Sequence, residues 1–210
     1  MLSALGIYVG MVLDVLLCLP GAVIAITLHG YTRARCAQAF GDPKPRAEER
    51  LTLNPLKQIE PIGLICACVW GMGWCKPASM MLNYFDPAYR RRNCLIVYIT
   101  PLLVNLLAGL LLGVCAMLLK PLVAPGVMLY VYWAVLGAAG VNVCYALGQC
   151  IPVYPMAGER ILCQFLKPNS IVKITQYQSI FQVLLMIGMA GGYLGLVIYP
   201  ICRLILTMAL

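Results

Sequence analysis

Long hydrophobic stretches separated by short polar segments set the pattern along this chain. A helix that crosses a membrane needs ~20 predominantly apolar residues, and four stretches are long enough: residues 4–28, 93–119, 126–149 and 179–202. A fifth apolar run, residues 61–74, has only 14 residues and predicts a re-entrant or interfacial segment. The pattern therefore predicts an all-α polytopic membrane protein with four to five transmembrane helices.

The composition supports the same interpretation. Hydrophobic residues make up 62% of the 210 residues and charged residues 10%, whereas soluble domains average roughly 45–50% and 25%. The mean hydropathy is +0.89. No linker, repeat or low-complexity tract divides the chain, so we expect one membrane domain over residues 1–210. The first stretch lacks the basic start of a signal peptide and is too long for one, so we expect it on the mature protein.

The distribution of basic residues predicts the orientation of the helices. Lys and Arg lie on both sides of residues 61–74, so a single crossing there would place basic loops on both faces of the membrane. If this run turns back instead, both termini are external and the loops at 29–92 and 150–178 are cytoplasmic. Of the 15 Lys and Arg, only Lys120 and Arg203 then lie outside, as the positive-inside rule expects. We therefore expect a multi-pass protein of the cell membrane with cytoplasmic basic loops.

Charge also indicates the partners. The net charge of +8 follows from this topology, so we expect membrane lipid and no nucleic acid. Arg90, Arg91 and Arg92 precede a span and are typical of an anchor to anionic lipid headgroups. Asp14 is the one acidic residue inside the four long stretches. We interpret it as a protonated acid bonded to a neighbouring helix, with a functional role as the alternative.

Cysteine and glycine in the apolar stretches both indicate helix packing. The 11 cysteines are an odd number, lie mostly in apolar stretches and predict no disulfide framework. Cys66, Cys68 and Cys75 could form a thiolate metal site, but zinc sites typically carry C-x(2–4)-C pairs in polar loops, so we favour packing. The Gly-rich run at 186–195 predicts a face for close helix contact. Its partner is a helix of the same chain, which we favour, or a second subunit in a homo-oligomer.

The single histidine of the chain lies where a site could form. His29 follows the first long stretch and the segment 149–162 follows the third, so the predicted topology places both at one membrane depth. Pro152 and Pro155 break the helix in that segment. Irregular backbone near a membrane is tolerated only where protein or a water-filled cavity surrounds it. An active site could therefore form between these segments.

Five segments carry a specific pattern of motifs. They read "HGYTRARCAQAFGDP" at residues 29–43, "ERLTLNPLKQIEPIG" at 49–63, "GWCKPASMMLN" at 73–83, "ITPLLVNLLAG" at 99–109 and "QCIPVYPMAG" at 149–158. In content and order they resemble the site-2 proteases, a family of intramembrane zinc metalloproteases. The resemblance covers residues 25 to about 162 and implies the core fold of that family.

The family's catalytic residues are mostly replaced. In the family, two histidines one helical turn apart and a distant aspartate hold zinc, and a glutamate between the histidines activates water. The resemblance places the first ligand at His29, whereas Gly30 stands at the glutamate position and Arg33 at the second histidine. Ala157 stands at the aspartate position. Because arginine is permanently charged and cannot be a ligand, the resemblance implies a degenerate member in which His29 is residual and no cofactor binds.

A rebuilt metal site is the alternative. His29, Cys36 and Glu159 could hold zinc, since Cys36 lies on the same helical face as His29. This set lacks a base at position 30 and leaves an arginine between its ligands. Gln58 and Gln149 also replace a histidine and an asparagine of the family pattern.

The remaining motif residues belong to the scaffold. By resemblance, Asn54 and Asn105 line a groove for a substrate segment, although both could simply tie helices together. Arg33 could pair with a carboxylate of a bound protein, or with Glu60 or Glu159. The sequence thus predicts a pseudoprotease that binds transmembrane or juxtamembrane segments of other membrane proteins. The alternatives are an active zinc metalloprotease with an altered metal site, a small-solute transporter, and a decaying paralogue without function.

Overall fold

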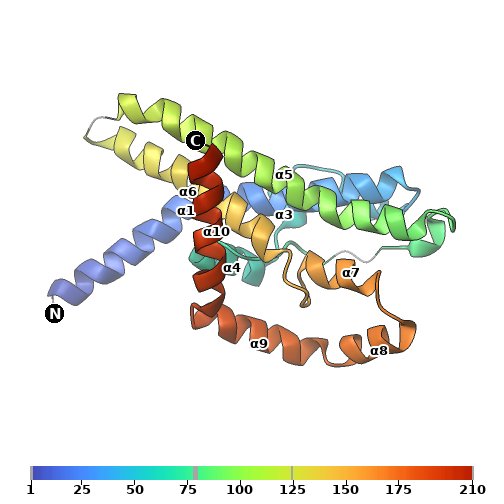
Figure 1. Ribbon diagram of the computed structural model, residues 1–210. Coiled ribbons are helices and arrows are strands. Elements are labelled where there is room, and N and C mark those ends of the chain that lie inside the picture. The colour runs from blue at the N-terminus through green and yellow to red at the C-terminus, as the bar shows by residue number, and fades with distance from the viewer. Residues whose placement is uncertain (1, 78–79, 124, 210) are drawn as a thin grey trace.

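Helices make up the fold of the computed structural model, which describes residues 2–77, 80–123 and 125–209 (Figure 1). Among these residues, the one β-type contact is an isolated bridge between Ile59 and Cys75. Two short 3-10 turns cover Leu82–Tyr84 and Lys120–Leu122. The helices are α1 (Leu2–Ala39), α2 (Lys44–Ala47), α3 (Pro55–Gln58), α4 (Pro61–Trp70), α5 (Arg90–Leu119), α6 (Val127–Gly148), α7 (Ala157–Cys163), α8 (Pro168–Gln176), α9 (Gln178–Ala190) and α10 (Tyr193–Ala209).

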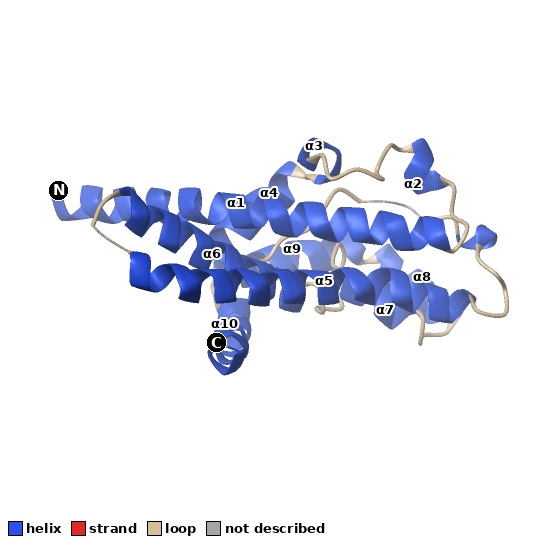
Figure 2. Cartoon of the chain, turned by 90° about the horizontal axis from the view of Figure 1, so that it is seen from above, coloured by secondary structure: helices blue, strands red, loops and turns tan. Residues whose placement is uncertain are grey.

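A bundle of α1, α5 and α6 forms the centre of the molecule (Figures 1 and 2). Small residues bring the three backbones together, because a side chain at Gly21 of α1 would collide with Ala138 of α6. A side chain at Gly109 of α5 would likewise collide with Val143 of α6. Asn142 of α6 is buried and donates a hydrogen bond from Nδ2 to the Gly21 carbonyl oxygen at 3.3 Å. Close packing and buried amides therefore hold α1 in place along its middle.

Three helices are long and apolar enough to cross a membrane, which confirms the polytopic all-α prediction. They cover Val12–Ala39, Arg90–Leu122 and Val127–Gly148. A fourth crossing is possible if α9 and α10 count as one bent span. α4 has 10 residues, so at 1.5 Å per residue it is about half as long as the ~30 Å hydrocarbon core is thick. The short run at 61–74 is therefore helical only in part and too short to cross, as the sequence predicted.

α1 extends beyond the predicted end of the first apolar stretch at residue 28. The polar residues that follow do not end the helix, since arginine, alanine and glutamine all favour helical backbone. The end comes at Gly41, whose φ of 100° leaves the helical region, and at Pro43. Asp42 fixes this turn: its Oδ1 accepts from the Lys44 N–H at 2.9 Å and its Oδ2 from the Met81 N–H at 3.1 Å. His29 consequently lies within a helix and not at its end.

The Gly-rich run forms a bend, which the sequence analysis did not predict, and its Met189 is buried in one cluster with Val143 and Cys144 of α6. α9 ends at Gly191, and Gly192 has a φ of 73°, which a residue with a side chain rarely adopts. A side chain at Gly188 or Gly195 would meet Leu194 or Tyr199, all within the same hairpin. The two helices meet at 66°. The predicted straight span over residues 179–202 is therefore broken in the middle.

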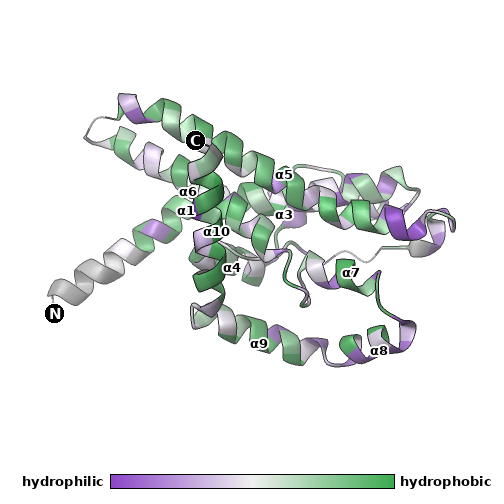
Figure 3. Cartoon of the chain, in the orientation of Figure 1, coloured by the Kyte–Doolittle hydropathy of each residue, from purple (hydrophilic) through white to green (hydrophobic). Residues whose placement is uncertain are grey.

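α10 packs across the central bundle instead of running along it (Figure 1). Its Ile198 and Cys202 are buried in a cluster with Val143 and Cys144 of α6 and Trp74. Figure 3 shows hydrophobic residues along α5, α6, α9 and α10, and hydrophilic residues gathered where α5 begins. This end of the bundle carries the motif residues.

Candidate functional site

His29 is packed inside the protein. Its side chain is 1% exposed, and its ring contacts the Tyr145 ring of α6 edge-on, with the centroids 5.5 Å apart. The Nδ1 atom has no hydrogen-bond partner among the described residues. A ligand histidine usually has its second nitrogen oriented by a carboxylate or carbonyl. Nδ1 of His29, the ligand position by resemblance, therefore has no such orienting partner among the described residues.

Gly30, at the position of the catalytic glutamate, is covered by Gln58. A Cβ atom at position 30 would collide with Gln58 Oε1 and lie 3.0 Å from its Cδ. Gln58 is completely buried, and its Nε2 donates to the carbonyl oxygens of Arg50 at 2.8 Å and Thr52 at 3.1 Å. The segment that leads into α3 is thereby fixed over α1. No space for a carboxylate remains at position 30 unless Gln58 moves.

Arg33, at the second histidine position, is used to hold the backbone after α4. Its Nη2 donates to the Lys76 carbonyl oxygen at 3.1 Å. Arg50 donates to the same oxygen from Nη1 at 2.8 Å and to the Pro77 carbonyl from Nη2 at 2.9 Å. Two guanidinium groups thus converge on two neighbouring carbonyls. A cation at this position opposes the binding of Zn²⁺.

The predicted carboxylate partners of Arg33 are engaged elsewhere. Among the described residues no ion pair joins Arg33 to Glu60 or Glu159. Glu60 caps α4 by accepting the Gly63 N–H at 2.6 Å. Glu159 is buried, lies 3.1 Å from the Arg160 Nε and accepts the Cys163 thiol proton at 3.3 Å. Burial, followed by the charge and hydrogen bond of Glu159, raises the pKa of the Cys163 thiol to about 11.

Ala157, at the aspartate position, lies at the start of α7 and is fixed by Gln149. The Gln149 Oε1 accepts the Ala157 N–H at 2.9 Å, and its Nε2 donates to the Gly73 carbonyl oxygen at 2.7 Å. The Ala157 methyl group packs with Tyr98 and Leu102 of α5. A buried amide therefore holds the segment after α6, and Ala157 makes only an apolar contact there.

The residues do not fit a zinc site. No group of three or more His, Cys, Asp or Glu side chains that could hold a metal occurs in the part of the chain that the structure describes. The set of His29, Cys36 and Glu159 is not brought together: Cys36 packs against the cluster around Phe85, whereas Glu159 pairs with its neighbours in α7. Cys66 lies buried in a hydrophobic cluster, as the packing interpretation expected.

The two asparagines predicted to line a groove lie in different settings. Asn54 is exposed and caps α3, with its Oδ1 accepting the Leu56 N–H at 3.1 Å. Asn105 is completely buried in α5 and donates to the Ala25 carbonyl oxygen of α1 at 3.2 Å. That carbonyl lies one helical turn before His29. Asn105 therefore ties α5 to α1 beside the histidine.

The space around Arg33 is small. A crevice of about 10 Å³ is lined by Gly30, Arg33, Ala34, Ala37, Asp42, Pro45, Glu48, Arg50 and Met80. One water molecule needs roughly 10–15 Å³ of such space. Neither Asn54 nor Asn105 lines it. The crevice beside Gly30 and Arg33 has room for about one water and none for a peptide segment.

Gln58, Gln149 and Arg50 organise the site, and the sequence analysis did not select them as site residues. Each is buried and donates hydrogen bonds to backbone carbonyls, and Arg50 also pairs with the Glu48 carboxylate at 2.9 Å. The sequence did contain a signal, because a polar residue within a motif of a mostly apolar chain needs a hydrogen-bond partner when it is buried. The partner itself could only come from the fold.

One comparison with known proteins gives a relative. No family model matches the chain, and no solved structure matches it. A Bacillus subtilis (strain 168) protein named "Putative zinc metalloprotease YwhC" is 28% identical over 162 residues, which cover 75% of this chain and 72% of the relative. The chain is metalloprotease-like. The polytopic helical fold and this relative together agree with the resemblance on which the site positions were assigned.

Proposed function

We propose that this chain is a pseudoprotease of the site-2 protease type, which binds transmembrane or juxtamembrane segments of other membrane proteins without cleaving them. The observation that carries the proposal is the filling of the catalytic positions. Gln58 occupies the space beside Gly30, and Arg33 holds the Lys76 carbonyl. Under this proposal both side chains stabilise the fold at positions where the family has catalytic residues.

Hydrolysis by zinc requires groups that this chain lacks. Three ligands hold the ion with one position open, and a base receives the proton of the bound water. Only His29 remains of those four positions, and a permanent cation stands one turn away. A methyl group at Ala157 provides no electron pair for a metal. We therefore propose that the chain retains the protease scaffold and does not catalyse hydrolysis.

The binding half of the proposal rests on the scaffold and the relative. A protease scaffold already presents surfaces to protein segments, and the relative is named as a metalloprotease. We further propose that the chain lies in the cell membrane with its basic loops in the cytoplasm. In that orientation the basic start of α5 meets anionic headgroups, with Arg91 over the Phe165 ring at 4.3 Å and Arg92 over the Tyr89 ring at 4.5 Å.

An active metalloprotease with an altered metal site is the second candidate, because the name of the relative favours it. Zinc would then be the cofactor, and ligands outside the family positions would have to hold it. The solute-transporter alternative gains no support from the crevice at Arg33, which is too small for more than about one water.

The test compares metal content, cleavage and binding in one preparation. The chain is purified without chelators, and zinc per mole is measured beside the variant His29→Ala. A fluorescent peptide with about 20 apolar residues is then added in lipid nanodiscs to detect cleavage and saturable binding. We expect zinc well below one per chain, an intact peptide and saturable binding. Stoichiometric zinc that is lost in His29→Ala, or a zinc-dependent product, would overturn the proposal, as would the absence of saturable binding.

A further inference from the structure

A groove runs between the first half of α1 and the first half of α6, away from the former catalytic positions. Its volume is about 560 Å³, against about 10 Å³ for the crevice at Arg33. Leu13, Asp14 and Leu17 of α1 form one wall, and Tyr130, Trp133 and Leu136 of α6 form the other. Figure 1 shows the N-terminal half of α1 diverging from α6, which opens the wedge.

Asp14 is the chemical feature of this groove. It lies within the apolar stretch Val12–Ala39, which is long enough to cross a membrane. Its side chain is exposed, and no hydrogen bond or ion pair to it occurs within the described residues. The sequence analysis expected a bond from a neighbouring helix, and the structure contains none. A carboxylate facing lipid is costly, and such residues normally pair with a partner.

The walls of the groove suit a helix. Gly10 of α1 lines it, and a Cβ there would meet nothing within 4 Å, so a second helix can approach closely at this point. Gly137 of α6 lies where the groove closes, because a Cβ there would meet Cys18 and Leu17 of α1. Tyr130 and Trp133 are 54% and 50% exposed. Aromatic rings of this kind provide a large contact area with a polar group at one end. An incoming helix would bury them together with the leucines.

From the unpaired carboxylate and the open groove we infer that this surface docks a transmembrane helix of another membrane protein that carries one Lys or Arg within its apolar stretch. The inference rests on the proposed function and places binding between α1 and α6, away from the closed former catalytic positions. The basic side chain would pair with Asp14, and the apolar residues around it would fill the wedge. Charge complementarity thus selects the bound segment.

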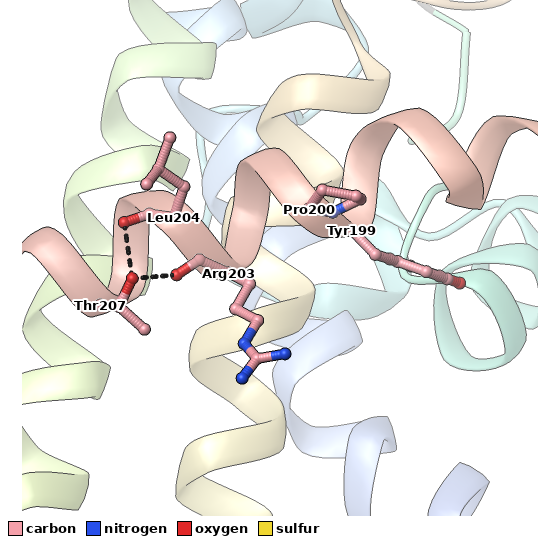
Figure 4. A pocket seen from close by; sticks show the side chains of 5 residues that line it. All are labelled: Tyr199, Pro200, Arg203, Leu204 and Thr207. Carbon is pink, nitrogen blue, oxygen red and sulfur yellow. Dashed lines mark hydrogen bonds between the residues drawn. The ribbon is translucent and has the colours of Figure 1, made fainter.

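A second copy of the chain fits this groove less well. Arg33 and Arg35 of α1 already make hydrogen bonds, so its basic residue within an apolar helix would be Arg203 of α10. Arg203 lines a separate groove with Tyr199, Pro200, Leu204 and Thr207 (Figure 4). α10 crosses the bundle transversely (Figure 1). Two copies inserted side by side in one membrane would therefore present α10 across the wedge and not along it. A helix of another protein has no such constraint.

The experiment uses two synthetic peptides that differ at one position. Each has about 20 apolar residues, with Lys or Leu at the centre, and binding to the full chain is followed by energy transfer in nanodiscs of neutral phosphatidylcholine. We expect the Lys peptide to bind about tenfold more tightly than the Leu peptide. Asp14→Asn should abolish the difference, whereas Asp14→Glu should retain it. Asp86→Asn, which changes an exposed loop carboxylate, should leave it unchanged.

The outcomes separate this inference from the proposed function. Equal binding of both peptides, or a preference that survives Asp14→Asn, would overturn the inference and leave the pseudoprotease proposal standing. Binding of neither peptide, or cleavage of either, would overturn the proposed function itself. A dimer of the chain that dissociates in both Asp14→Asn and Arg203→Gln would assign the groove to a second copy and likewise overturn the inference.

Discussion

The two ends of α1 differ in how their polar residues are used. Around Gly30 and Arg33, the side chains of Arg33, Arg50 and Gln58 donate hydrogen bonds to backbone carbonyls, and the remaining space is about 10 Å³. Around Asp14, a charged side chain has no hydrogen bond or ion pair among the described residues, and about 560 Å³ is open. The comparison teaches that the motif residues are closely packed at one end of α1, whereas the open space lies at the other end.

The largest effect should come from the Gln149 amide, which holds the segments around Gly73 and Ala157 together. Gln149→Ala leaves the Gly73 carbonyl and the Ala157 N–H without their partner in a buried place. We expect a loss of about 2–4 kcal/mol in the free energy of unfolding, measured by denaturant titration in detergent micelles. Gln164→Ala is the matched control, because Gln164 donates to the Arg160 carbonyl at an exposed place, and it should cost less than about 0.5 kcal/mol. Equal effects would show that this end is not held closed by Gln149.

A smaller effect should come from adding a single methyl group beside Gln58. Gly30→Ala places a Cβ against Gln58 Oε1, so we expect a loss of about 1–3 kcal/mol. Gly140→Ala is the matched control, since a Cβ there meets nothing within 4 Å, and it should be neutral or stabilising by up to about 1 kcal/mol. In the Gln58→Ala background, Gly30→Ala should cost less free energy of unfolding than it does in the unchanged protein. Strict additivity in this double-mutant cycle would contradict the direct contact.

The smallest effect on stability should come from the open end of α1. Asp14→Asn removes a carboxyl group that makes no hydrogen bond or ion pair among the described residues. We therefore expect the free energy of unfolding to stay within about 0.5 kcal/mol or to rise, while the peptide preference is lost. Loss of stability would instead mean that Asp14 holds the fold and would remove the contrast between the two ends.

Much of the fold could be predicted from the hydrophobic pattern, because long apolar runs leave few alternatives in a membrane. The resemblance also implied which positions carry replaced residues, and the structure puts Gly30 and Arg33 on one helix with His29. The role of Gln58 could not be predicted, because nothing in the local sequence indicates that its segment packs against Gly30. The bend at Gly191 and Gly192 was missed for a different reason. Glycines three or four apart fit both a packing face and a helix break, and only the φ of 73° at Gly192 decides between them.

The hydrogen bonds of Gln149 also have a consequence for how the protein is made. The side chain joins residues 73 and 157, which lie 76 positions before it and 8 positions after it. The ribosome produces these segments in sequence, at roughly 5–20 residues per second. The Gln149 Oε1 lacks its hydrogen-bond donor until Ala157 has been synthesised. A nascent chain that stops before Ala157 would therefore carry an open junction, and quality-control proteases could distinguish it from the finished protein.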